Sequence, residues 1–271
     1  MIDFQHILVP FDGSSSSQVA LNMAISLSKR FQSKITAVYV KRTDDDKKAS
    51  KVSDDIKAIS AEQGIEMTFL QPTGKMFKEV VRTVEQVEAG LVIMGTHGVS
   101  GFEEFWIGSN AFRVVSSSPV PVITMQEDFD KRGFKKILAP IDQSKETRQK
   151  VPHLAQIAKV FEADIHLLGA TKYTDPDSHA TVKRYLEQST ELLEKQGLNV
   201  ETSYTLGQNI AKSTLEAAVE FDVDLTIMMS ESEPSSGLFM GSNAQQVVNR
   251  SGTPVLTLHP KDISVVAAAG Y

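Results

Sequence analysis

Short apolar runs alternate with longer amphipathic stretches along the first half of this 271-residue chain. Runs such as 91–94 (Leu-Val-Ile-Met) are continuously apolar, which is typical of strands buried on both faces of a parallel sheet. After the first run, Val19, Met23 and Leu27 recur at helical spacing. The pattern predicts strands at 5–11, 34–41, 66–70, 91–95 and 120–125, and helices at 17–31, 47–63, 76–88 and 110–116.

This alternation predicts an α/β fold, a doubly wound parallel sheet with helices on both faces. Ser14 to Ser17 precede the first helical pattern and are good N-cap candidates. In such sheets ligands bind beyond the carboxyl ends of the strands, where the strand order reverses. The residues that follow the apolar runs are therefore the first place to look for a site.

The second half of the chain repeats the first. His-Ile-Leu-Val-Pro-Phe-Asp at 6–12 returns as Lys-Ile-Leu-Ala-Pro-Ile-Asp at 136–142, and Gly-Ser-Asn at 108–110 returns at 241–243. Because these landmarks keep their order, we predict two copies of one domain of ordinary size. The expected boundaries are 1–126 and 134–260, with a charged linker between the copies and a short tail after them.

Composition narrows the class of protein. Hydrophobic residues make up 41% and charged residues 23% of the chain, as in soluble globular proteins. The net charge of −6 gives no attraction for nucleic acid or an anionic membrane, so neither is an expected partner. Absence of cysteine excludes disulfides and thiolate metal sites. With no signal-like start and no membrane-length apolar run, we expect a cytoplasmic protein.

A glycine-rich segment follows the apolar run at 91–94. It contains Gly95, Gly98 and Gly108, and then Ser109 and Asn110 open the last predicted helix of the first copy. Glycines allow close backbone approach and positive φ, and amides at a helix N-terminus attract anions. We therefore expect a phosphate-bearing ligand here. The alternative is an ordinary glycine-containing connection between a strand and a helix.

No catalytic machinery emerges from the sequence. His97 lies inside the glycine-rich segment, but no His, Asp or Glu is positioned by the sequence to orient it. The chain has no G-x4-G-K-[ST] loop and no metal-ligand spacing among its histidines. Lys41 and Arg42 follow the second strand and are candidate phosphate contacts in what is otherwise a solvated charged run. Binding, with at most slow hydrolysis, is the favoured interpretation.

Taken together, these residues resemble the universal stress protein family. The first copy carries the family's nucleotide-binding pattern Gly-x2-Gly-x9-Gly-Ser at 95–109, and the opening Asp-Gly-Ser turn at 12–14 matches as well. The resemblance implies two five-stranded Rossmann-like sheets of order 3-2-1-4-5 and binding of ATP or a related adenine nucleotide, with or without Mg²⁺. It implies that the following residues bind the nucleotide, from the base to the phosphates: Pro10, Asp12, Val40, Met94, Gly95, His97, Gly98, Gly108, Ser109 and Asn110.

The second copy departs from this pattern. One alignment puts Met229 at the position of Gly95 and Ser232 at that of Gly98, and another puts Met228 and Glu231 there. Both lose the two loop glycines, so the second domain is expected to keep the fold and to lack a working nucleotide site.

The resemblance also implies how the domains assemble. Family members commonly dimerise through the last strand, so the two copies are expected to form an intramolecular pseudo-dimer through 120–125 and 254–258. Pro119, Pro121 and Pro254 fit edge positions, since proline cannot donate to a central ladder. The implied role is a nucleotide-dependent regulator of a protein partner in the stress response. A scaffold without nucleotide, a slow ATPase and a homodimer of whole chains remain open alternatives.

Overall fold

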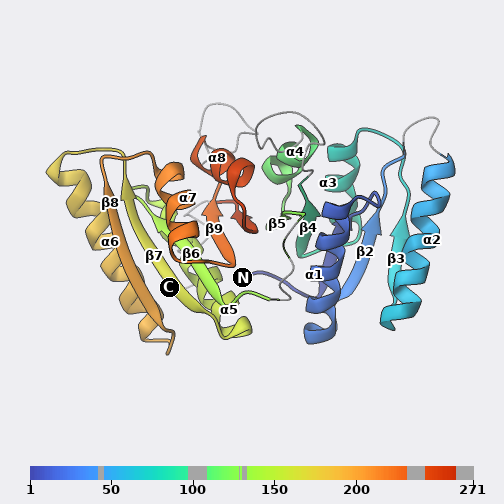
Figure 1. Ribbon diagram of the computed structural model, residues 1–271, viewed down its shortest axis with the longest axis horizontal. Helices are drawn as coiled ribbons and strands as arrows, with labels where there is room; N and C mark the ends of the chain where they lie inside the picture. Colours follow the sequence, from blue (N-terminus) through green and yellow to red (C-terminus); the bar gives the residue numbers. More distant parts are fainter. Residues whose placement is uncertain (42–45, 97–108, 128, 130–132, 231–241, 261–271) are drawn as a thin grey trace.

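The computed structural model describes residues 1–41, 46–96, 109–127, 129, 133–230 and 242–260 (Figure 1). Strands and helices alternate along both halves of the described chain. The first half consists of β1 (His6–Pro10), α1 (Ser15–Phe31), β2 (Lys34–Val38), α2 (Asp46–Gln63), β3 (Met67–Leu70), α3 (Met76–Gln86), β4 (Leu91–Gly95), α4 (Ser109–Ser117) and β5 (Val122–Met125).

The second half repeats this order, with a short 3-10 helix, η1, ahead of its first α-helix. It consists of β6 (Lys136–Ile141), η1 (Glu146–Lys150), α5 (Val151–Phe161), β7 (Asp164–Thr171), α6 (Pro176–Glu194), β8 (Val200–Leu206), α7 (Ile210–Glu220), β9 (Leu225–Met229), α8 (Ser242–Arg250) and β10 (Val255–Leu258). None of the described helices is long and apolar enough to cross a membrane.

The described strands form one sheet of order β3-β2-β1-β4-β5-β10-β9-β6-β7-β8. Each half has the predicted order 3-2-1-4-5 with parallel neighbours, and the halves join where β5 and β10 pair antiparallel, with Ile123 opposite Leu256. Figure 1 shows the resulting pseudo-twofold arrangement, with α1 and α5 near the middle and α2 and α6 at the two ends. The predicted fold and intramolecular pseudo-dimer are confirmed.

Both faces of the central strands of the sheet are buried, as the continuous apolar runs predict, whereas the outer strands β3 and β8 are partly exposed. Along β1, Ile7 and Val9 belong to the core under α1, whereas Leu8 belongs to the core under α3 and α4. Successive side chains of a strand point to opposite faces, so a strand covered on both sides must be apolar throughout. Both cores include residues from both halves, so apolar packing continues across the β5–β10 junction.

The ends of the elements show where sequence periodicity falls short. The strand predicted at 34–41 ends at Val38, although Lys41 still forms an isolated bridge with Thr73. The helix predicted at 76–88 ends at Gln86, and Glu88 adopts a left-handed φ of 52°. Ser14 caps α1 by accepting from the Ser17 amide, which confirms the predicted capping role.

The expectation of edge positions for the prolines holds only within each half. In the whole sheet, β5 and β10 are central strands, and Pro121 and Pro254 lie immediately before them. Their carbonyls accept hydrogen bonds from the amides of Val92 (3.0 Å) and Thr226 (2.9 Å). Proline is tolerated here because each residue supplies an acceptor to the ladder and no donor is required of it.

Candidate functional site

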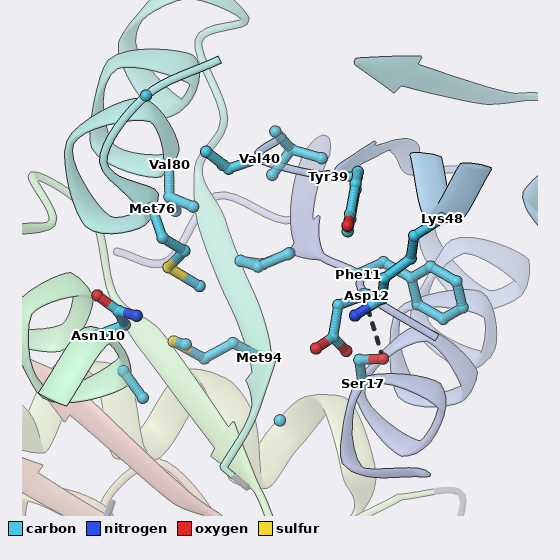
Figure 2. Close-up of a pocket in the computed structure, with 15 residues that line it drawn as sticks. Phe11, Asp12, Ser17, Tyr39, Val40, Lys48, Met76, Val80, Met94 and Asn110 are labelled. Carbon is cyan, nitrogen blue, oxygen red and sulfur yellow. Dashed lines mark hydrogen bonds between the residues drawn. The ribbon is translucent and has the colours of Figure 1, made fainter. Parts of the chain in front are cut away.

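A cavity of about 440 Å³ opens at the carboxyl ends of β1, β2 and β4 in the first half. Figure 2 shows its lining side chains, which come from the ends of these strands and from α1, α2, α3 and α4. Strand ends in a parallel sheet converge on one edge, and β1 and β4 flank the point where the strand order reverses. The cavity therefore lies where the sheet topology predicts a ligand site.

The structure brings together many of the residues that the sequence nominated. Those that line this cavity are Pro10, Asp12, Val40, Met94, Gly95 and Asn110. Ser109 is the first residue of α4, next to Asn110. His97, Gly98 and Gly108 lie outside the described residues. Residues far apart in sequence thus meet at one cavity, and the roles assigned to them by resemblance stay predictions.

Asp12 lies just after β1 and shapes the turn into α1. Its Oδ1 accepts hydrogen bonds from the Ser14 amide (3.0 Å) and the Ser14 hydroxyl (2.6 Å). The Asp12 amide donates to Ser17 Oγ (3.4 Å), as Figure 2 shows. This Asx-type turn fixes the orientation of a carboxylate that also lines the cavity. The structural role and the place in the cavity therefore coexist at Asp12.

Gly95 is required by packing against α1. A Cβ added at Gly95 would collide with the backbone of Ser16 and lie 2.7 Å from the Ser17 amide nitrogen. Gly95 does not have a positive φ, so its need for glycine comes from this close approach rather than from its backbone conformation. The first turn of α1 can press onto the end of β4 only because Gly95 has no side chain.

Sequence reasoning missed several lining residues, of which Lys48 and Tyr39 add new chemistry. Lys48 comes from the first turns of α2, and its Nζ lies 5.9 Å from the centre of the Tyr39 ring. The predicted helix at 47–63 already contained Lys48, and the structure starts α2 at Asp46; the placement of this first turn beside the cavity is what the sequence did not show. Lys41, a candidate phosphate contact, forms an ion pair with Asp46 (2.5 Å), and Arg42 lies outside the described residues.

The equivalent position in the second half is a smaller cavity, of about 160 Å³. Strand pairing fixes the equivalence, because Leu91 lies opposite Ile7 as Leu225 lies opposite Ile137. Counting along β4 and β9 then places Met229 at the position of Gly95. This register decides between the two alignments that the sequence leaves open.

The first helix begins differently in the two halves. In the first half α1 begins at Ser15, against Gly95; in the second half Met229 stands in the place of Gly95. The buried Met229 side chain occupies the end of β9, and the chain opposite forms η1 before α5 begins at Val151. Pro152 adds a second cause, since an uninterrupted helix would place its ring against the carbonyl of Arg148. Lys150 replaces the buried Ala20 of the first half, is only 2% exposed, and donates to Thr147 Oγ1 (2.9 Å).

Among the described residues, no group of three or more His, Cys, Asp and Glu side chains could hold a metal ion. Asp12 is the one carboxylate among the described residues that line the larger cavity. The described part of the site thus offers a mostly apolar chamber with one acid, one lysine and the amide side chain of Asn110.

Comparison with known proteins identifies the class of protein that this fold and cavity define. The model of the universal stress protein family matches residues 3–125 and again residues 133–259. The two matches cover most of the chain, so the chain belongs to the universal stress protein family.

Individual relatives match one half of the chain. A universal stress protein of Methanocaldococcus jannaschii is 26% identical over 141 residues, covering 46% of this chain and 83% of the relative. A universal stress protein of Bacillus subtilis is 24% identical over 147 residues, covering 45% of this chain and 99% of the relative.

Solved structures match the whole chain. The universal stress protein from Archaeoglobus fulgidus DSM 4304 superposes with a TM-score of 0.77 at 20% identity, covering 97% of this chain and 100% of that one. A putative universal stress protein from Pseudomonas aeruginosa UCBPP-PA14 gives a TM-score of 0.74 at 20% identity, covering 97% and 95%. At these identities the likeness is one of fold, and it extends over both halves.

Proposed function

We propose that the first half binds ATP or a related adenine nucleotide in its 440 Å³ cavity, and that the protein acts as a nucleotide-dependent regulator in the stress response. One observation carries the proposal: residues nominated by the family pattern, from four separate segments, line a single cavity at the switch point of the sheet. Its volume falls within the range of about 300–1,000 Å³ that is usual for small-molecule sites.

The lining chemistry fits a nucleotide. The side chains of Met76, Val80 and Met94 form an apolar wall against which a base could pack, and Asp12 can accept hydrogen bonds from its amino group. The N-terminal end of α4, at Ser109 and Asn110, would face the phosphates with free amides and a favourable dipole.

We infer that Mg²⁺, where present, is bound chiefly by the phosphates of ATP. Mg²⁺ requires several oxygen ligands, and among the described lining residues only Asp12 supplies a carboxylate. The nucleotide would therefore bring most of the ligands with it. Regulation would follow if the bound nucleotide alters the surface that a protein partner contacts.

Replacement of Asp12 tests the site, and Asp142 supplies a matched control. Asp142 occupies the same turn in the second half, where its Oδ1 accepts from the Ser144 amide (2.7 Å). We expect Asp12→Ala to weaken ATP binding about 10- to 100-fold, since a hydrogen bond to a charged group contributes about 1.5–3 kcal/mol. Asp142→Ala is expected to leave the affinity unchanged. Isothermal titration calorimetry of both variants measures the difference.

The same titration tests the restriction to one half. The proposal predicts one nucleotide per chain. Two nucleotides per chain, or equal losses of affinity in Asp12→Ala and Asp142→Ala, would contradict the assignment of the site to the first half. Absence of ATP binding by the unmodified protein would favour a scaffold without nucleotide.

A further inference from the structure

A hydrogen-bonded histidine connects the two halves between their cavities. His259 follows β10 directly, and both nitrogens of its ring have partners. Nε2 lies 2.9 Å from the carbonyl oxygen of Val115 in α4 of the first half, and Nδ1 lies 2.7 Å from Ser230 Oγ in the second half. A carbonyl can only accept, so Nε2 carries the proton and donates to Val115, while neutral Nδ1 accepts from the Ser230 hydroxyl.

Val115 has a carbonyl that its own helix cannot satisfy. In a helix this carbonyl would accept from the residue four positions later, which is Pro119 and has no N–H. The preceding carbonyl, that of Val114, still accepts from the Ser118 amide (2.9 Å). Val115 is fully buried, so an unpaired carbonyl there would be costly. His259 thus caps the C-terminal end of α4 from the opposite half of the molecule.

The hydrogen-bonded path from Ser230 through His259 to α4 has a cavity at each end. At one end, Ser230 lines the 160 Å³ cavity of the second half. At the other, α4 begins at Ser109, and its residues Asn110 and Ala111 line the 440 Å³ cavity of the first half. Val115 is only five residues beyond Asn110, about 7.5 Å along a helix. A short helix moves as a unit, so a donor that holds one end also sets the position of the other.

The pseudo-symmetric position is built differently. Strand pairing makes Thr96 and Gln126 the counterparts of Ser230 and His259. Thr96 Oγ1 lies 2.9 Å from Gln126 Oε1, so a hydroxyl pairs with the next strand in both halves. The counterpart of Pro119 is Gly252, which has an N–H. Pro119 and His259 therefore occupy one of two pseudo-equivalent positions, and Gly252 and Gln126 occupy the other.

From this geometry we infer that His259 is a positioning residue for the first cavity: it holds α4 through Val115 and links the Asn110 end of that cavity to Ser230 in the second half. This inference rests on the proposed function only in naming ATP as the ligand of the first cavity. The capping of α4 by His259 does not depend on which ligand binds.

Variants that differ in reach test the inference. Glutamine at position 259 has an amide that can donate to Val115 and accept from Ser230, whereas the amide of asparagine is one methylene shorter. We expect His259→Asn and His259→Leu to weaken ATP binding about fivefold, the lower end of usual coupling between sites. His259→Gln is expected to stay within about twofold of the unmodified protein, a change small beside that coupling.

A second buried histidine provides the matched control. His166 Nε2 lies 2.7 Å from Ser203 Oγ between β7 and β8, away from α4. His166→Leu also removes a buried histidine–serine pair from the second half, so it should cost stability without changing ATP affinity. Equal affinity losses in His166→Leu and His259→Leu, or no loss in His259→Leu and His259→Asn, would overturn the inference.

Amide hydrogen exchange separates this inference from the proposed function. Residues 110–117 should exchange faster in His259→Asn than in His166→Leu, with or without nucleotide. If the unmodified protein does not bind ATP, the proposed function fails, and the exchange of α4 still decides the role of His259. Unchanged exchange of α4 in His259→Asn would refute that role even where ATP binds well.

Discussion

The two halves of this protein share a fold and differ in their cavities. Asp12 and Asp142 follow equivalent strands and accept hydrogen bonds from equivalent serine amides, at 3.0 and 2.7 Å. Nevertheless the first half encloses about 440 Å³ and the second about 160 Å³. The fold follows from apolar periodicity and the turn after the first strand, which both halves keep. We attribute the difference in cavity volume to the approach of the first helix to the fourth strand, which Gly95 allows in the first half and which the buried Met229 side chain replaces in the second.

Replacement of Gly95 by methionine, the residue at the equivalent position of the second half, should have the largest effect on stability and ATP binding. In Gly95→Met the new side chain would collide with the backbone of Ser16, and the first turn of α1 would have to move. We expect the free energy of unfolding to fall by about 1–3 kcal/mol, as for other overpacked sites. We also expect ATP binding to be lost, because Asp12 and Ser17 move with that turn. Urea denaturation and calorimetry measure the two effects.

The control is made at the equivalent position of the second half. Met229→Leu roughly conserves volume, so it should cost less than about 1.5 kcal/mol and leave ATP binding intact. If Gly95→Met were as stable as the unmodified protein and still bound ATP, the explanation of the two cavities by Gly95 and Met229 would be wrong.

Most of the fold could be predicted from the sequence because it depends on local patterns. The continuous apolar run at 91–94 and the helical spacing of Val19, Met23 and Leu27 reflect burial directly. Because the sequence at 136–142 repeats that at 6–12, the same topology could be predicted for the second half. Element ends were less predictable, since they depend on single hydrogen bonds and turns. The register of β9, for example, required the strand pairing of Leu225 with Ile137.

The candidate site could be predicted only where function leaves a local pattern. Asp12 stands in a recognisable turn after β1 and Gly95 ends the apolar run of β4, so the family pattern finds both. The helix predicted at 47–63 contains Lys48 and agrees with α2 to within one residue, but the sequence does not show that the start of this helix borders the cavity. His259 acts on a carbonyl 144 residues away, a distance over which the sequence gives no pairing signal. The contacts of Lys48 and His259 can be recognised only once the positions of α2 and α4 in the fold are known.

Removal of a helix N-cap should have an intermediate effect on the free energy of unfolding, and this effect should differ between the two halves. Ser14 Oγ accepts from the Ser17 amide and caps α1, whereas the equivalent Ser144 precedes η1, whose N-cap is Lys145 without a side-chain bond. We expect Ser14→Ala to lower the free energy of unfolding by about 1 kcal/mol, the usual value of an N-cap. Ser144→Ala should change it by less than about 0.5 kcal/mol.

Thermal or urea unfolding of the two serine variants measures this difference. Ser14 also donates to Asp12, so ATP affinity should fall in Ser14→Ala and stay constant in Ser144→Ala. Equal stability losses would mean that η1 and α1 begin with equally strong caps, contrary to the hydrogen bonds described.

The smallest expected effect is a loss of folding stability on acidification, which arises from buried histidines. Burial lowers the pKa of His6 in the first half, and it lowers the pKa of His166 and His259 in the second half below the usual 6.5. Glu201 and Glu220 partly oppose this lowering of the pKa at His166. The unfolded chain therefore binds protons more readily than the folded chain at these positions. Stability from the neutral rings is complete above pH 6.5 and is lost as the pH falls from 6.5 through the lowered pKa values.

Replacement of His166 isolates one of these contributions. His166→Gln cannot titrate, so its free energy of unfolding should decline less steeply than that of the unmodified protein between about pH 6.5 and pH 5. The loss of stacking on Phe221 lowers stability equally at every pH, so measurements at about pH 8, where the unmodified ring is neutral, serve as the reference. Carboxylates common to both proteins cancel in the difference. A parallel decline in the two proteins would mean that His166 titrates alike in the folded and unfolded chains, and burial beside Phe221 would then not disfavour its charge.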